Sequence, residues 1–308
     1  SIKISRPLPY DWKLHTKLPE VAFNEAKEIC PHLNELKLPA TSSLLDLFLK
    51  CQVKHFEVFD FVRGIGIARI KFFRQNQHKL ETLVISLTIS QLFRSEGSSS
   101  SALAGVPFKL KQLTLHYPSL QTQQDYNNFT SFVSCHRDTL RYLKLSTFSD
   151  QFDALSPFAE CRLLKSVDLY NYTLSDSVVL DQVEKIRIQY MIARGLKFNE
   201  KFPNLKEIEL LNPHYSPLLI DGIAQLEHLE KLTLHYIPLN TLTLLNVKIL
   251  VLENCSLSLN SKIIAVNGTL SHLYLINCPP SEWLTNYVNL IDTQLELLHC
   301  SKMRVSTR

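Results

Sequence analysis

The sequence is organised around short stretches in which apolar residues recur at fixed but unequal intervals. The clearest example places Leu229, Leu232 and Leu234 in the spacing L-x-x-L-x-L. This spacing has neither the period of an amphipathic helix nor the sustained alternation of a long strand. It favours a short strand with two inward-facing side chains, bent sharply at both ends. One such unit presents an apolar edge too narrow to bury itself, so a chain built this way must stack its units.

The same spacing opens again at Leu205, Val247 and Leu270. In the last two copies a cysteine, Cys255 or Cys278, follows the final strand leucine by three positions. A degenerate copy follows near residues 295 and 297. The predicted repeats begin at Leu33, Val53, Leu80, Leu110, Leu140, Leu164, Val183, Leu205, Leu229, Val247 and Leu270.

This pattern resembles the leucine-rich repeat, L-x-x-L-x-L-x-x-N/C-x-L, over roughly nine-tenths of the chain. The resemblance implies an α/β solenoid: a leucine-rich repeat horseshoe with a concave parallel sheet and irregular convex helices and loops. Cys255 and Cys278 occupy the position where the family takes Asn or Cys. We therefore expect them to be buried turn residues, not metal or redox groups.

The repeat register predicts a domain organisation and a set of strands. Residues 1–16 are expected to form an N-terminal arm or linker, 17–300 a solenoid of about eleven repeats, and 301–308 a C-terminal tail. The Ser-rich run 95–102 is expected to be a flexible inserted loop. Helices are expected at 21–29, 44–50 and 129–135, and Leu143 and Leu145 are expected to be buried. The predicted strands lie near 35–39, 55–59, 82–86, 112–116, 142–146, 166–170, 185–189, 207–211, 231–235, 249–253 and 272–276.

Composition excludes several classes of function. The formal charge of +4 is mild, and acidic residues are interleaved with the basic ones, which argues against nucleic acid as a partner. No apolar run reaches the length of about 18 residues that a membrane span needs. The seven cysteines are odd in number and widely spread, which favours reduced thiols in the cytoplasm or nucleus. Four N-x-[ST] sequons keep an extracellular location open as the alternative.

Motifs for catalysis and cofactors are missing from the sequence. Glycine is rare, at 7 residues, and no Gly-rich phosphate loop occurs. Neither H-E-x-x-H nor G-x-S-x-G is present, although a catalytic triad assembled across repeats stays open. We therefore predict a non-enzymatic protein with no cofactor and no metal site.

The candidate binding residues lie at the third, fifth and seventh positions of each repeat. Side chains at these positions alternate with the buried ones and point outward from the concave face of the sheet. Tyrosine, arginine and histidine are enriched at interface hot spots, although any solvated sheet face also carries mixed polar residues. We predict a protein partner centred on Tyr142, Lys144, Tyr170 and Arg187. The full predicted set is His116, Tyr142, Lys144, Asp168, Tyr170, Lys185, Arg187, Gln189, Glu209 and His235, with Glu207 and Lys231 beside them.

A second resemblance concerns the connection between one helix and the next strand. The motif F-x-x-x-H-x-x-T-L at Phe132, His136, Thr139 and Leu140 is similar to repeats of F-box proteins. That resemblance implies an array that captures substrates for a cullin-RING ubiquitin ligase, with an F-box that docks a Skp-type adaptor. No full F-box occurs in residues 1–30, so the adaptor is expected only if an F-box lies upstream of Ser1. The alternative is a non-ligase scaffold in a nuclear, RNA-export or signalling assembly.

Overall fold

The computed structural model describes the repeat strands and part of their connections. The described residues are 2–3, 35–39, 53–59, 76, 78–85, 109–116, 120, 122–146, 153–172, 178–190, 198–211, 223, 225–265, 269–278 and 297–301. The predicted helices at 21–29 and 44–50, the predicted loop 95–102, and residues 4–16 and 302–308 lie outside them. The chain forms two compact units, Ser1–Leu164 and Lys165–Arg308, and each is considered by itself.

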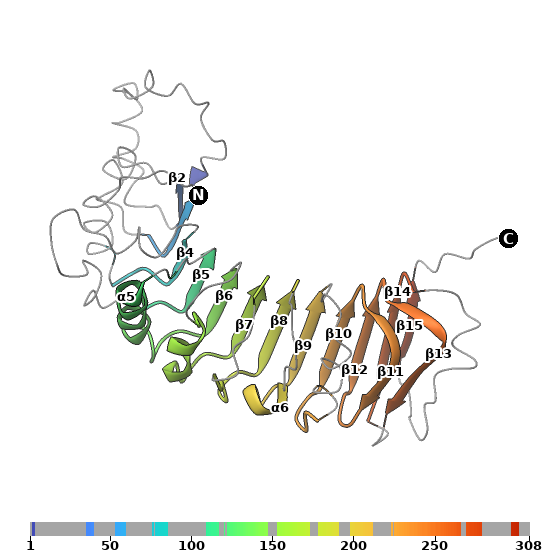
Figure 1. Cartoon of the computed structure of the whole chain (residues 1–308). Coiled ribbons are helices and arrows are strands. Elements are labelled where there is room, and N and C mark those ends of the chain that lie inside the picture. The colour runs from blue at the N-terminus through green and yellow to red at the C-terminus, as the bar shows by residue number, and fades with distance from the viewer. Residues whose placement is uncertain are drawn as a thin grey trace. The chain divides into compact units, whose positions relative to one another are not determined.

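The first unit is a parallel sheet in which strands that follow each other in sequence lie side by side, in the order β1-β2-β3-β4-β5-β6 (Figure 1). Two residues of the predicted N-terminal arm form β1, which pairs with β2. The strands are β1 (Ile2–Lys3), β2 (Glu35–Pro39), β3 (His55–Phe59), β4 (Thr82–Ile85), β5 (Gln112–His116) and β6 (Tyr142–Ser146).

The second unit continues the same construction, with seven parallel strands in the order β7-β8-β9-β10-β12-β14-β15 (Figure 1). The degenerate copy predicted near residue 297 is confirmed as β15, which pairs with β14. The strands are β7 (Ser166–Tyr170), β8 (Lys185–Gln189), β9 (Glu207–Leu211), β10 (Lys231–His235), β12 (Ile249–Glu253), β14 (His272–Ile276) and β15 (Leu297–Ser301).

The strand register follows the leucine positions. Leu232 pairs with Leu250, and Leu250 pairs with Leu273, so equivalent residues of successive repeats lie next to one another. All three side chains are fully buried. Leu143 and Leu145 are also 0% exposed, which confirms the predicted register. All eleven predicted strands are present, so the fold is a leucine-rich repeat solenoid.

Each strand of the second unit for which the turn is described is followed by a residue with left-handed backbone geometry. After β7, β8, β10 and β12 the N–H of this residue donates to the last carbonyl of the next strand of the sheet, as Asn254 does to Ile276 at 2.8 Å. The thiol of the following residue then turns inward: Cys255 Sγ donates to the carbonyl of Leu234 in the preceding repeat at 3.2 Å. Cys278 repeats this contact with Leu252 at 3.3 Å. The expected structural role of both cysteines is confirmed.

A helix covers the core of the first unit between β5 and β6. Helix α5 spans Gln123–Ser134, so the predicted start at residue 129 is wrong. The helix begins earlier because Thr122 and Asp125 form a capping box, in which each side chain accepts the other's backbone N–H. Phe129 of α5 packs edge-to-face, with ring centroids 5.7 Å apart, on Phe158 of the short helix η3 (Ser156–Glu160).

The cover of the second unit is partly β structure. After the short helix α6 (Phe198–Lys201), the strands β11 (Pro238–Leu244) and β13 (Ser256–Ala265) form a separate two-stranded parallel sheet. The expectation of helices and irregular loops on this side is therefore wrong for these repeats. Leu242 and Leu244 of β11 are buried, because alternation along an extended strand turns one face to the core. Leu239 is buried as well, on the other side of a register shift between Leu239 and Thr241. In the part of the chain that the structure describes, no helix is long and apolar enough to cross a membrane.

Candidate functional site

The outward positions of the strands carry the predicted binding residues. Strand after strand has the burial pattern of two buried leucine positions between three more exposed ones, as in β8, β9 and β10. A β-strand turns successive side chains to opposite faces, so the first, third and fifth strand residues share the face away from the core. We call this the exposed face of the sheet.

In the first unit the exposed face carries His116, Tyr142 and Lys144. Tyr142 and Lys144 lie on β6, and both are half-buried. His116 lies at the end of β5, where its Nδ1 is 3.2 Å from the Oγ of Ser146 on β6. Ser146 is itself buried, so the histidine is anchored to the sheet at this point.

In the second unit the exposed face carries the other seven predicted residues. Tyr170 and Gln189 are half-buried at the ends of β7 and β8, and Tyr170 packs edge-to-face on Tyr190, with ring centroids 5.5 Å apart. Asp168 lies in the predicted column but is only 6% exposed. Little of the Asp168 side chain is therefore accessible, and its part in partner binding stays a prediction.

The charges over β8, β9 and β10 are largely paired with one another. Strand register places Lys185 beside Glu207 and Arg187 beside Glu209, with N···O distances of 2.8 and 3.3 Å. His235 of β10 lies between two carboxylates. Its Nε2 is 3.5 Å from Glu209, and its Nδ1 is 3.0 Å from Glu253 of β12. We call Lys185, Arg187, Glu207, Glu209, His235 and Glu253 the charged face.

The predicted centre draws on both units. Tyr142 and Lys144 belong to the first unit, and Tyr170 and Arg187 to the second. Within the second unit, Arg187, Glu209 and His235 are brought together by the ion pairs above. The joint centre of four residues stays a prediction.

Sequence reasoning missed an apolar surface at the other end of the second unit. The outward positions of β12, β14 and β15 carry Ile249, Val251, Tyr274, Ile276 and Leu297, which are half-buried or exposed. The signal was present in the sequence, because the same outward columns could have been followed past residue 235. We call Ile249, Val251, His272, Tyr274, Ile276, Leu297 and His299 the aromatic–aliphatic patch.

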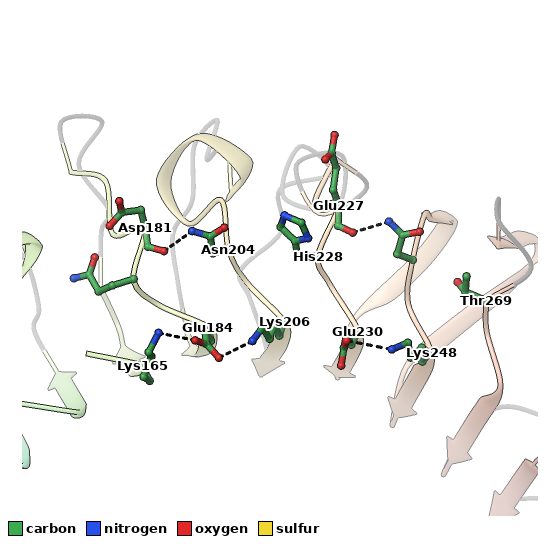
Figure 2. Close-up of a pocket in the computed structure, with 12 residues that line it drawn as sticks. Lys165, Asp181, Glu184, Asn204, Lys206, Glu227, His228, Glu230, Lys248 and Thr269 are labelled. Atoms are coloured by element: carbon green, nitrogen blue, oxygen red, sulfur yellow. Dashed lines mark hydrogen bonds and ion pairs between the residues drawn. The ribbon is translucent and has the colours of Figure 1, made fainter. Parts of the chain in front are cut away.

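A third surface lies where the strands of the second unit begin. The residue after the first apolar position of each repeat alternates in charge along Lys165, Glu184, Lys206, Glu230 and Lys248 (Figure 2). Glu184 accepts hydrogen bonds from Lys165 at 2.6 Å and from Lys206 at 2.9 Å, and Glu230 accepts one from Lys248 at 3.1 Å. We call these five residues the edge column. The alternation of charge one position after each first leucine was the missed sequence signal.

The edge column borders an open groove of about 600 Å³. Amide side chains also link its repeats. Asn204 donates to the carbonyl of Asp181 at 2.8 Å (Figure 2). Asn246 donates to the carbonyl of Glu227 at 2.6 Å. The hydrogen bonds from both lysines lower the pKa of Glu184, and the bond from Glu184 raises the pKa of Lys206. These pairs link neighbouring repeats, which makes the column a structural seam.

The buried thiols do not form a reactive or metal-binding group. Burial raises the pKa of Cys255 to about 12 and, with help from Glu160 and Asp138, raises the pKa of Cys161 to about 12. A thiol with so high a pKa is a poor nucleophile and a poor metal ligand, because both roles need the thiolate. Among the residues that the structure describes, no three His, Cys, Asp or Glu side chains are grouped to hold a metal ion.

Comparison with known proteins gives a match only among solved structures. No family model matches the chain, and no curated protein is similar to it in sequence. One solved structure that it resembles is an internalin, InlF, from Listeria monocytogenes strain 4b F2365. The identity is 12% and the TM-score 0.42, over 92% of this chain and 89% of that one. The leucine-rich repeat fold rests on the strand register and the buried leucine positions described above.

Proposed function

We propose that this chain is a protein-recognition domain whose partner binds the exposed face of the sheet in the second unit. The observation that supports this proposal is that Tyr170, Arg187 and His235 stand at fixed strand positions on that face. Residues of these types contribute most to binding when they are held in place beside a partner. Parallel strands already order the backbone, so a partner binds with little loss of conformational entropy.

The edge column has an indirect part in the proposed binding. Its lysines and glutamates form a network between repeats, and a partner there would have to replace those contacts. Exposed ion pairs contribute little to stability individually, but several charges that form a network contribute more. In this proposal the edge column holds the surface to which the partner binds.

The direct test is capture of partners from a cell lysate by the full chain. A variant with Tyr170→Ala and Arg187→Glu is expected to lose partners that the unchanged chain retains. Arg162→Glu is a matched control, because it reverses an exposed positive charge in a turn outside the strands. Loss of the same partners from the control, or their retention by the double variant, would contradict the proposed face.

We also propose, from the sequence resemblance, that this recognition serves an F-box type cullin-RING ubiquitin ligase in the cytoplasm or nucleus. The supporting motif builds the turn between α5 and β6. The rings of Phe132 and His136 are 4.7 Å apart, and Thr139 Oγ1 donates to the carbonyl of Leu110 at 2.9 Å. The motif therefore has a packing role that explains its spacing.

Ligase membership is tested with the protein expressed from its complete gene. Co-purification of a Skp-type adaptor and a cullin would support it, and fluorescence microscopy would test the location. Capture of protein partners without either component would instead favour the non-ligase scaffold. Neither outcome decides which surface binds the partner. The lysate test above decides that.

A further inference from the structure

The aromatic–aliphatic patch is a continuous surface. Strand register places Ile249 beside His272, and His272 beside Leu297. In the next outward column, Val251 lies beside Tyr274. Leu297 is 41% exposed, and several apolar side chains lie next to one another here, which is more informative than one exposed leucine. The patch therefore offers apolar area that folding of the chain has left accessible.

Three ring side chains in the patch pack against one another. The ring of Tyr274 is stacked with that of His272, with centroids 6.5 Å apart and planes at 19°. On the other side it contacts His299 of β15, with centroids 5.9 Å apart. Such contacts limit the motion of each ring, so a partner meets a largely preformed surface.

Lys231 borders the patch and has no counter-ion among the residues that the structure describes. Lys231 on β10 lies between Glu207 and Ile249 in the strand register. Glu207 is paired with Lys185 at 2.8 Å, and among the described residues Lys231 takes part in no ion pair. Glu253, the carboxylate on the patch side, is held by His235 at 3.0 Å. Lys231 is therefore the cation at this border that a carboxylate of a partner can pair with.

We infer that the aromatic–aliphatic patch and Lys231 together bind an acidic–apolar peptide segment of a partner protein. Apolar side chains of the segment pack on Val251, Tyr274 and Leu297, and a carboxylate pairs with Lys231. Apolar contact around that pair excludes water and strengthens it. A basic segment would be repelled by Lys231. This inference rests on the proposed function, because it names the partner class for the same face.

The test measures binding of fluorescein-labelled synthetic peptides to the full chain by fluorescence anisotropy. Three peptides of equal length are used: one alternating Glu with Leu and Phe, one with Lys in place of Glu, and one with Ser in place of Leu and Phe. The acidic–apolar peptide is expected to bind about tenfold more tightly than either of the others. Equal binding of the Lys peptide would overturn the charge assignment, and equal binding of the Ser peptide would overturn the apolar one.

Substitutions locate the site. Lys231→Glu and Tyr274→Ala are each expected to weaken binding of the acidic–apolar peptide about tenfold or more, while Lys231→Arg retains it. Arg162→Glu is again the matched control, because it reverses an exposed positive charge in a turn outside the strands. Thermal melts establish that each variant is folded. Binding that survives both Lys231→Glu and Tyr274→Ala would overturn the inference.

The outcomes separate this inference from the proposed function. If lysate partners are lost with Tyr170→Ala and Arg187→Glu but no peptide depends on Lys231, the sheet face binds proteins and the peptide class is wrong. If neither set of substitutions affects any partner or peptide, both proposals fail.

Discussion

The charged face and the aromatic–aliphatic patch occupy the same side of the same sheet. They differ in whether their side chains form ion pairs with one another. Over β8 to β10, Arg187 and Glu209 neutralise each other across neighbouring strands. Over β12 to β15, Val251 and Tyr274 face one another without any charge to pair. A partner on the charged face must compete with existing ion pairs, whereas the patch is stabilised by any apolar cover. Identical strand geometry therefore supports two different kinds of recognition.

The strand ends differ between the two regions as well. Strands β8 and β10 are followed by Tyr190 and Tyr236, with φ of 54° and 56°. Strands β12 and β14 are followed by Asn254 and Asn277, with nearly the same φ. Asparagine adopts this left-handed geometry readily, while a bulky side chain is strained in it. The repeats of the charged face therefore carry backbone strain that the repeats of the patch avoid.

The largest expected effect tests the core beneath both regions. Leu232→Ala in β10 and Leu273→Ala in β14 are each expected to lower the free energy of unfolding by about 2–5 kcal/mol. Both side chains are fully buried, and their neighbours cannot refill the space. Chemical denaturation measures both. A loss below about 1 kcal/mol in either variant would show that the corresponding repeat is not packed as described.

The next effect tests the strained turns. Tyr236→Asn is expected to raise the free energy of unfolding by about 1 kcal/mol, because asparagine tolerates positive φ. The reciprocal change Asn254→Tyr, in a repeat of the patch, is expected to lower it by a similar amount. Thermal melts compare the two variants. The difference between the regions is refuted if both substitutions shift the melting temperature in the same direction.

A smaller effect tests the pairing of the charged face. A double-mutant cycle with Lys185→Ala and Glu207→Ala is expected to give a coupling free energy of about 0.2–1 kcal/mol, since both side chains are partly exposed. The coupling should shrink in high salt because mobile ions screen exposed charges. A parallel cycle on Val251 and Tyr274 should keep its coupling in salt. Equal salt sensitivity of the two cycles would contradict the contrast.

The smallest effect concerns the edge column, which both regions share. The folded-state pKa of Glu184 lies below its ordinary value of 4.5, so the stability that its ionised form contributes is present above that value and is lost as pH falls through the lowered pKa. The difference in melting temperature between the unchanged chain and Glu184→Gln should therefore narrow as the solution is acidified below that range. A difference that stays constant or widens on acidification would show that Glu184 is not held by the two lysines. Titration of the Glu184 carboxyl by NMR measures the shift directly.

Much of the fold could be predicted because it depends on local spacing. The leucine positions placed the strands β2 to β10, β12, β14 and β15, since a side chain such as Leu143 is buried only if the strand turns that side to the core. The capping box at Thr122 could also have been found, and would have corrected the start of α5. The strands β11 and β13 could not, because a short apolar segment that covers a core can be extended or helical with similar burial.

The sequence by itself determined the stack of repeats, the two faces of each strand and the buried role of Cys255 and Cys278, because these follow from the periodicity of side chains along a chain. Only the tertiary structure decided which outward side chains pair with a neighbour and which do not. The burial of Asp168 and the pairing of Arg187 with Glu209 depend on side chains contributed by neighbouring repeats. So does the lack, within the described part of the chain, of an ion pair to Lys231. Distances between residues about 20 positions apart are set by stacking, and no spacing within a single repeat contains them.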